Sequence, residues 1–127
     1  MISIIILNYN AGNLLIDCIS SIMNSNLKDF EIILVDNCSS DNSHLDCKKK
    51  FDSIKLIENK ENLGYCEGNN VGLRAAHGDF LMILNPDTTV TPDWADELLS
   101  AYQKFGEGLY QPKILSMSEP KRLGTTG

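Results

Sequence analysis

The sequence predicts an α/β domain built on an open, mostly parallel sheet with flanking helices. Short β-branched, apolar runs alternate with segments of helical periodicity along most of the chain, and this alternation is typical of parallel sheets with right-handed crossovers. The runs are apolar at consecutive positions, as strands are when both faces of a sheet are covered. We therefore expect a Rossmann-like arrangement of strands and helices.

Each predicted element rests on its own local pattern. Four buried strands are predicted from continuous apolar runs: residues 2–7 (ISIIIL), 31–35 (EIILV), 54–57 and 80–84 (FLMIL), with a fifth expected at 109–114. Helices are predicted where apolar residues recur at helical spacing: 14–23, a short helix ending at Lys50, 65–76, and 93–105, which follows Pro92. We expect residues 1–115 to form the domain and 116–127 a polar tail that leads to a further half absent from this sequence.

Composition excludes several classes of protein. The 127 residues suit one domain. The net charge of −6 and the pI near 4.7 disfavour nucleic acid as a partner, which requires a basic surface. The four cysteines form no C-x-x-C pair, so we expect free thiols in a reducing compartment. No secretory signal or transmembrane segment is evident. We expect a cytoplasmic protein. A longer form of it could also dock peripherally at the inner face of the membrane.

Polar turns follow three of the predicted strands. They are Asn8-Tyr9-Asn10, Asp36-Asn37 and Asn85-Pro86-Asp87. Because the carboxyl ends of parallel strands share one edge of a sheet, these turns should converge on a ligand site there. The first turn has only Gly12 where a dinucleotide fold has G-x-G-x-x-G. A bound diphosphate would therefore need a cation, and Asp87 is the candidate ligand for it.

Four motifs occur in order along the chain. They are I-I-I-L-N-Y-N at 4–10, V-D-N-x-S-x-D at 35–41, N-x-G-Y-x-x-G-x-N-x-G-L-x-x-A-x-G-D at 62–79, and L-N-P-D-T at 84–88. With this order and spacing the chain resembles the family 2 glycosyltransferases of GT-A fold, and most closely their rhamnosyltransferase-like branch. The resemblance implies binding of a nucleoside-diphosphate sugar, dTDP- or UDP-linked, with Mn²⁺ or Mg²⁺ as cofactor. It also implies inverting transfer to a glycan or lipid-linked acceptor in cell-surface polysaccharide synthesis.

The same resemblance implies a role for each matching position. Tyr9 lies beside the nucleotide base, and Asp36 accepts a hydrogen bond from it. The family's D-x-D motif corresponds to Asn85-Pro86-Asp87, with Asn85 near the ribose and Asp87 on the metal. Asn10, Asn37 and Asn70 complete the expected nucleotide-binding set, the last within the N-x-G step that ends at Gly72.

Other interpretations of these residues remain open. Asp36 and Asp87 also suit ordinary turn chemistry. The chain is alternatively a non-catalytic nucleotide-binding or regulatory α/β domain, or a nucleotidyltransferase, although the latter's glycine-rich basic loop is missing after the first strand. The family's catalytic base is a carboxylate well beyond the D-x-D position, and neither Glu107 nor Glu119 has its surroundings. We therefore expect the base beyond residue 127 and little transfer by this chain alone.

Overall fold

A four-stranded parallel sheet forms the centre of the first of two compact units, Met1–Pro92. The computed structural model describes residues 1–111, 114–115 and 123–125. The strand order is β3-β2-β1-β4, and every neighbouring pair is parallel. The strands are β1 Ile2–Asn8, β2 Phe30–Asp36, β3 Lys55–Glu58 and β4 Phe80–Leu84. The predicted α/β fold with an open parallel sheet is confirmed, and the bounds of each of these four strands lie within one residue of the prediction.

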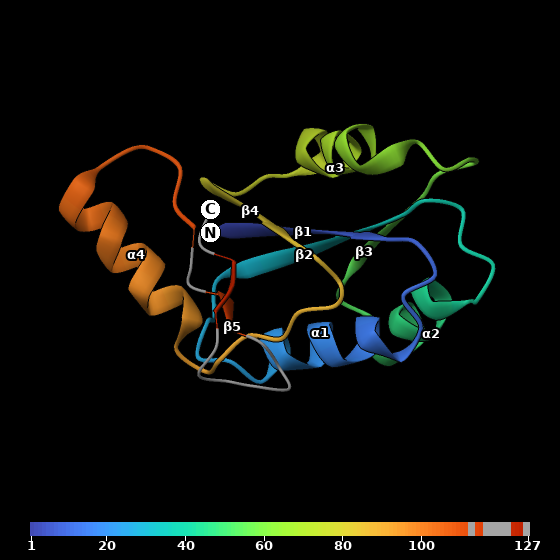
Figure 1. Cartoon of the computed structure of the whole chain (residues 1–127), viewed down its shortest axis with the longest axis horizontal. Helices are drawn as coiled ribbons and strands as arrows, with labels where there is room; N and C mark the ends of the chain where they lie inside the picture. Colours follow the sequence, from blue (N-terminus) through green and yellow to red (C-terminus); the bar gives the residue numbers. More distant parts are fainter. Residues whose placement is uncertain (112–113, 116–122, 126–127) are drawn as a thin grey trace. The chain divides into compact units, whose positions relative to one another are not determined.

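Helices cover both faces of this sheet (Figure 1). Helix α3 (Gly64–Ala75) packs on one face against β1 and β2, while α1 (Asn13–Met23) and α2 (Ser43–Lys50) lie together on the other. Double coverage explains the continuous apolar run of β1, in which Ile4, Ile5 and Ile6 are all fully buried. Helix α1 buries one face against the sheet. The buried residues recur at helical spacing and are Leu15, Cys18, Ile19 and Ile22.

Two glycines allow α3 to approach the sheet closely. A Cβ atom on Gly72 would lie 2.5 Å from Ile5 Cγ2 and 3.1 Å from Val35 Cγ2. A Cβ on Gly68 would lie 2.6 Å from Leu7 Cδ1. These contacts are shorter than packed carbon atoms tolerate, so the absent side chains set the distance between α3 and the strands.

A small polar cluster lies at the edge of the sheet where the parallel strands begin. Glu31 accepts hydrogen bonds from the Ser3 hydroxyl at 2.5 Å and from the backbone N–H of His77 at 2.7 Å. The Ser3 hydroxyl in turn accepts from the N–H of Gly78. Burial acts to raise the pKa of Glu31, but these hydrogen bonds outweigh it and hold the pKa below its usual value. The cluster fixes the turn between α3 and β4 to the start of β1.

The second compact unit, Asp93–Gly127, contains α4 (Trp94–Phe105) and a short antiparallel pair. Strand β5 (Ile114–Leu115) pairs with β6 (Leu123–Thr125). The strand predicted at 109–114 was wrong for residues 109–111, which form no strand; positions 112–113 lie outside the described residues, and Ile114 lies in β5. Most of the predicted polar tail, 116–122 and 126–127, also lies outside them, and the domain boundary at residue 115 stays a prediction.

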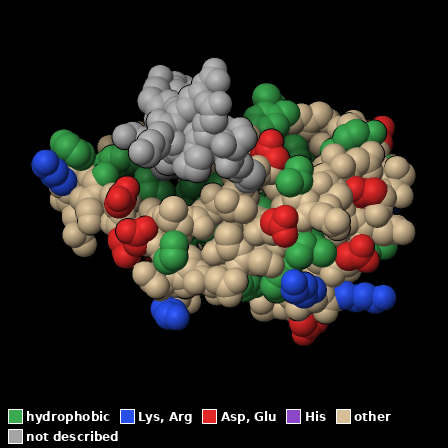
Figure 2. Space-filling view, turned by 60° about the horizontal axis from the view of Figure 1, so that its bottom comes forward, with side chains coloured by type: hydrophobic (Ala, Val, Ile, Leu, Met, Phe, Trp, Pro, Cys, Tyr) green, Lys and Arg blue, Asp and Glu red, His purple; other side chains and the backbone are tan. Residues whose placement is uncertain are grey.

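The face shown in Figure 2 has no dominant positive region: its acidic side chains are scattered singly, and its few basic side chains lie near the margins of the view. None of the helices in the described part of the chain has the length and apolar character needed to span a bilayer. All four cysteines are free, with Cys18 and Cys47 buried and Cys38 and Cys66 exposed.

Candidate functional site

The order of the strands in the sheet reverses between β1 and β4, and the candidate site lies where these strands end. The chain moves from β1 to β2 and β3 on one side, and then returns to place β4 on the other side of β1. The parallel registers bring Asn8 level with Asp36, and Ile6 level with Leu84. All three predicted polar turns therefore leave the sheet at one edge. In open α/β sheets the crevice at such a reversal is where ligands bind.

Asp36 forms the centre of a buried hydrogen-bond network at the end of β2. Its Oδ1 accepts hydrogen bonds from Asn8 Nδ2 at 2.9 Å and from the Ser39 hydroxyl at 2.7 Å, and its Oδ2 accepts from the Ser39 N–H at 2.8 Å. Only 1% of Asp36 is exposed. Both carboxylate oxygens accept hydrogen bonds from the protein, and the direct contact of Asp36 with a base that the family resemblance implies stays a prediction. The immediate effect of this carboxylate is to fix the two turns around it.

Two further side chains complete this network. Asn8 is fully buried and its Nδ2 also reaches the Ser43 hydroxyl at 2.8 Å, which ties β1 to the start of α2. His44 places Nδ1 3.4 Å from Asp36 Oδ1, within ion-pair range although not aligned as a hydrogen bond, and Nε2 3.3 Å from Glu58 Oε1. The sequence analysis gave Asn8 only as part of a polar turn and Ser39 only as part of a motif, and it missed His44.

Asn10 joins the turn after β1 to the loop after β2. Its φ of 52° lies in the left-handed region, and its side-chain oxygen accepts hydrogen bonds from the N–H groups of Ser40 and Asp41. A second hydrogen bond joins the same two loops, because the Asp41 carboxylate accepts from the Gly12 N–H at 2.9 Å. Hydrogen bonds from Ser43, with a smaller one from Gly12, hold the pKa of Asp41 below its usual value. The two loops are thus locked to each other before any ligand arrives.

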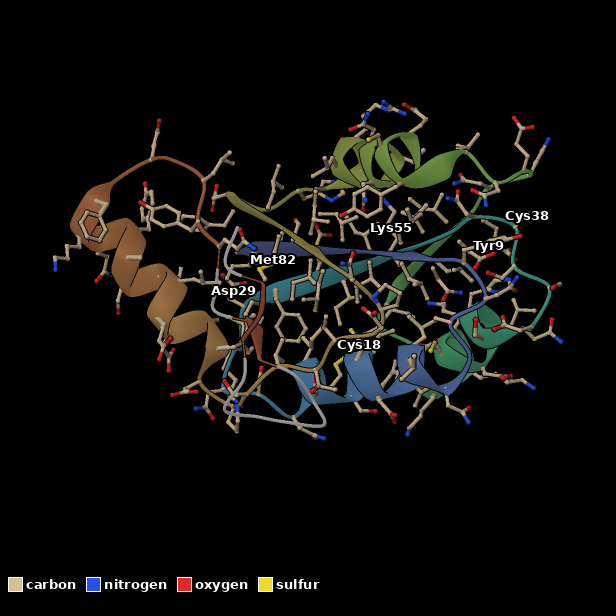
Figure 3. The ribbon with its side chains drawn as sticks, viewed as in Figure 1. Tyr9, Cys18, Asp29, Cys38, Lys55 and Met82 are labelled. Carbon is tan, nitrogen blue, oxygen red and sulfur yellow. The ribbon has the colours of Figure 1, made fainter. Side chains whose placement is uncertain are left out.

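Tyr9 stands outside this locked network. It is 54% exposed at the carboxyl end of β1, and Figure 3 shows it beside the loop that carries Cys38. An exposed ring on a rigid turn offers a flat apolar face on which a planar ligand can stack.

Asn37 fixes the chain segment that leads into α3. Its Oδ1 accepts hydrogen bonds from Asn59 Nδ2 at 2.9 Å and from the Leu63 N–H, and its Nδ2 donates to the Gly64 carbonyl. It is 2% exposed. Like Asp36, it shapes the edge of the site from within the protein.

The turn after β4 has a different character. Asn85 and Asp87 are both exposed, and the Asn85 carbonyl accepts hydrogen bonds from the Thr88 N–H and hydroxyl, which closes the turn. Within the described part of the chain the Asp87 carboxylate has no hydrogen-bond or ion-pair partner. It is a free carboxylate next to the strand-order reversal, on the side of β4.

The oxygen-bearing side chains of this turn suit only one kind of metal site. No group of three or more His, Cys, Asp or Glu side chains that could enclose an ion occurs among the described residues. Mg²⁺ bound with a nucleotide is commonly held by one or two carboxylates together with phosphate oxygens and water. A single free carboxylate at Asp87 fits a cation that arrives with a diphosphate, and does not fit a resident structural metal.

The predicted site residues therefore fall into three groups. Hydrogen bonds connect the loops of Tyr9, Asn10, Asp36 and Asn37, while Asn85 and Asp87 lie at the end of the next strand. Asn70 lies apart, on the exposed face of α3, with Nδ2 3.5 Å from Glu67 Oε2. Because Gly68 and Gly72 turn the other face of the helix to the sheet, Asn70 points away from it.

Several known proteins are similar to this chain. An uncharacterised glycosyltransferase of Haemophilus influenzae is 34% identical, over 100% of this chain and 40% of that protein. The poly(ribitol-phosphate) beta-glucosyltransferase of Bacillus spizizenii is 34% identical over 68% of this chain and 14% of that protein. The chain thus spans less than half the length of these relatives.

Solved structures share the fold. TarS 1–349 of S. aureus, in complex with UDP-GlcNAc, superposes with a TM-score of 0.74 at 19% identity, covering 93% of this chain and 41% of that one. The mannosyltransferase PcManGT from Pyrobaculum calidifontis, in complex with GDP-Man and Mn²⁺, gives a TM-score of 0.68 at 21% identity, covering 89% of this chain and 33% of that one.

The sequence as a whole also matches one family model. The model of glycosyl transferase family 2 aligns with residues 3–124, nearly the entire chain. The fold, the polar edge at the strand-order reversal and this match agree, and the chain belongs to glycosyl transferase family 2.

Proposed function

We propose that this chain binds a nucleoside-diphosphate sugar at the carboxyl ends of β1 and β4, with a divalent cation held by Asp87. The observation that carries the proposal is the placement of two dissimilar turns on either side of the strand-order reversal. The β1 side presents the exposed ring of Tyr9, and the β4 side presents the free carboxylate of Asp87. A nucleotide needs both an apolar face for its base and charge neutralisation for its diphosphate.

The nucleoside contacts are assigned to the β1 and β2 side. Tyr9 stacks on the base, and the network around Asp36 holds the Tyr9 turn and the 37–41 loop in place. Direct acceptance of a base N–H by Asp36, which the family resemblance implies, requires the base to reach this 1% exposed carboxylate, whose Oδ2 accepts one hydrogen bond, from the Ser39 N–H, within the protein. Asn10, Asn37 and Asn70 remain in the proposed set, the first two as residues that shape the pocket wall.

The diphosphate is assigned to the β4 side. Asn85 lies near the ribose and Asp87 holds Mn²⁺ or Mg²⁺. With asparagine at position 85 the turn carries one carboxylate, so affinity for the free cation is low and metal and nucleotide bind together. When bound, the cation neutralises the charge that develops on the leaving diphosphate. This assignment is supported by the PcManGT structure, which was solved in complex with GDP-Man and Mn²⁺.

The reaction is transfer of the sugar, with inversion, to an acceptor hydroxyl. The acceptor oxygen attacks the anomeric carbon opposite the diphosphate and loses its proton to a general base. We place that base, a carboxylate, in the acceptor-binding part of longer family members. This chain's own residues bind and orient the donor. The acceptor is a glycan or lipid-linked acceptor in cell-surface polysaccharide synthesis. Its place at the cell surface is supported by the names of two relatives, the poly(ribitol-phosphate) beta-glucosyltransferase and the minor teichoic acid biosynthesis protein GgaB of Bacillus subtilis.

The donor is proposed to be UDP- or dTDP-linked. UDP-GlcNAc in the TarS complex supports a uridine nucleotide. The rhamnosyltransferase-like motifs favour dTDP-rhamnose, and this finer assignment rests on the motifs alone. Both bases present the same ring N–H and carbonyl groups, so one pocket accepts either of them.

Thermal stability with added nucleotide tests the proposal. UDP, dTDP, GDP and ADP are each added with and without Mn²⁺ to the wild-type chain, to Asp87→Ala, and to Asp17→Ala, an exposed carboxylate on α1 that serves as the matched control. A ligand at about 100 times its dissociation constant adds about 2.7 kcal/mol, which for a domain of this size raises Tm by on the order of 10 °C. We expect this shift with UDP or dTDP plus Mn²⁺, in wild type and Asp17→Ala only. Absence of a shift with every nucleotide contradicts donor binding by this chain, and a shift that persists in Asp87→Ala contradicts the metal assignment.

A further inference from the structure

The segment that carries Asp87 lies along α1 and is attached at three points, two on the helix and one just after it. The Cys18 thiol donates to the Asn85 carbonyl at 3.8 Å. The Ser21 hydroxyl accepts a hydrogen bond from the Val90 N–H at 3.0 Å. Just beyond the helix, the Asn26 N–H donates to the Pro92 carbonyl at 2.7 Å. Figure 3 shows Cys18 on α1 pointing toward the chain that leaves β4.

The central attachment has a defined direction. The Ser21 hydroxyl donates its own hydrogen to the Cys18 carbonyl at 2.7 Å, so its lone pairs are left to accept from Val90. One hydroxyl thereby links the backbone of α1 to the backbone of the 85–92 segment, three residues after Asp87. A serine at this position does what an alanine of nearly the same size cannot.

The first attachment uses a thiol that stays protonated. Cys18 is fully buried, and burial raises its pKa to about 12, with the nearby Asp87 charge acting in the same direction and a hydrogen bond with Thr88 opposing it. The thiol therefore remains a donor at neutral pH. The Asn85 carbonyl accepts from Cys18 and twice from Thr88, so the turn around Asp87 is closed from α1 as well as from within.

Asp87 itself has no partner among the described side chains that would orient it. Its carboxylate is placed only by the backbone of its turn, and that backbone is placed by α1. We infer that Ser21 and Cys18 are positioning residues, which hold the Asp87 turn in the geometry that receives the metal–diphosphate complex. This inference rests on the proposed function for its ligand, while the attachment itself is independent of any ligand.

Ser21→Ala tests the inference, with Ser20→Ala as the matched control, because Ser20 lies on the same helix and its hydroxyl makes no hydrogen bond within the described structure. Amide hydrogen exchange at Val90, measured by NMR without ligand, should become about tenfold faster in Ser21→Ala. The dissociation constant of Mn²⁺, measured at saturating UDP, should rise roughly three- to tenfold, as for loss of one hydrogen bond. Binding of uridine, which has no phosphate, should be unchanged.

The thiol attachment is tested separately. Cys18→Ala should weaken Mn²⁺ binding in the same way, and Cys18→Ser, which keeps a hydrogen-bond donor, should restore it.

The outcomes separate the inference from the proposed function. Unchanged Val90 exchange in Ser21→Ala overturns the attachment, and faster exchange with unchanged Mn²⁺ affinity overturns the positioning role. Equal weakening of uridine and Mn²⁺ binding points to general loosening and also overturns it. If the wild-type chain binds no nucleotide with metal, the proposed function fails and the positioning role fails with it, while the exchange data still decide whether Ser21 holds the segment.

Discussion

Replacing Asn8 with alanine should disrupt the hydrogen-bond network around Asp36 and lower the stability of the fold. Asn8 Nδ2 donates to the Asp36 carboxylate at 2.9 Å and to the Ser43 hydroxyl at 2.8 Å, and Asn8 is fully buried. A hydrogen bond to a charged group contributes about 1.5–3 kcal/mol and a neutral one about 1 kcal/mol. Asp36 keeps its two donors from Ser39 but loses the one from β1. We expect the free energy of unfolding to fall by about 3 kcal/mol.

Urea unfolding followed by circular dichroism measures this loss. The midpoint should fall with little change in slope, and Tm should fall by roughly 12 °C at about 4 °C per kcal/mol. Asn13→Ala is the matched control, because Asn13 is an exposed asparagine on α1 whose side chain makes no hydrogen bond within the described structure. It should change stability by less than about 0.5 kcal/mol. Equal stability of the two variants would refute the view that this network stabilises the site.

Three further predictions concern packing, pH and the base contact. Gly72→Ala should destabilise the fold by about 1–3 kcal/mol in urea, because its Cβ meets Ile5 at 2.5 Å, whereas Asn70→Ala on the exposed face of α3 should be nearly neutral. Glu31 has a lowered pKa in the folded state, so its stabilising effect is full above its usual value of 4.5 and is lost as the pH falls below it; Glu31→Gln should flatten that part of a plot of urea midpoint against pH, and an unchanged plot would contradict the shift. Tyr9→Ala should weaken UDP binding about tenfold by calorimetry while Tyr9→Phe retains it, since stacking contributes about 1–3 kcal/mol per base; equal loss in both would implicate the hydroxyl instead.

Much of the architecture was predictable because burial on both faces leaves a strong local signal. The runs ISIIIL, EIILV and FLMIL are apolar at consecutive positions, and the structure places each in the parallel sheet. The convergence of the three turns also followed from local sequence, since the carboxyl ends of parallel strands meet at one edge. A strand was expected at 109–114, which overlaps β5 at Ile114, but β6 and its antiparallel pairing with β5 were not predicted, because strands of two and three residues carry no periodicity.

The organisation within the site could not be predicted in the same way. Asn8 resembles any asparagine that ends a strand, and its partners Asp36 and Ser43 lie 28 and 35 residues away. Nothing local distinguishes the enclosed carboxylate of Asp36 from the free one of Asp87, because their exposure depends on which loops pack over them. The outward direction of Asn70 was implicit in the spacing of Gly68 and Gly72, which marks the face of α3 that meets the sheet.

Paramagnetic broadening by Mn²⁺ tests most directly whether the ligand binds where β1 and β4 diverge. Amide NMR spectra of the isotopically labelled chain are recorded with UDP and Mg²⁺, and again after trace Mn²⁺ is added. We predict that signals of residues 85–91 broaden most strongly, that Tyr9 and the 37–41 loop broaden less, and that the amino-terminal edge around Glu31 and His77 stays sharp. Broadening centred on any other edge of the sheet, or broadening at 85–91 that survives Asp87→Ala, would contradict the account.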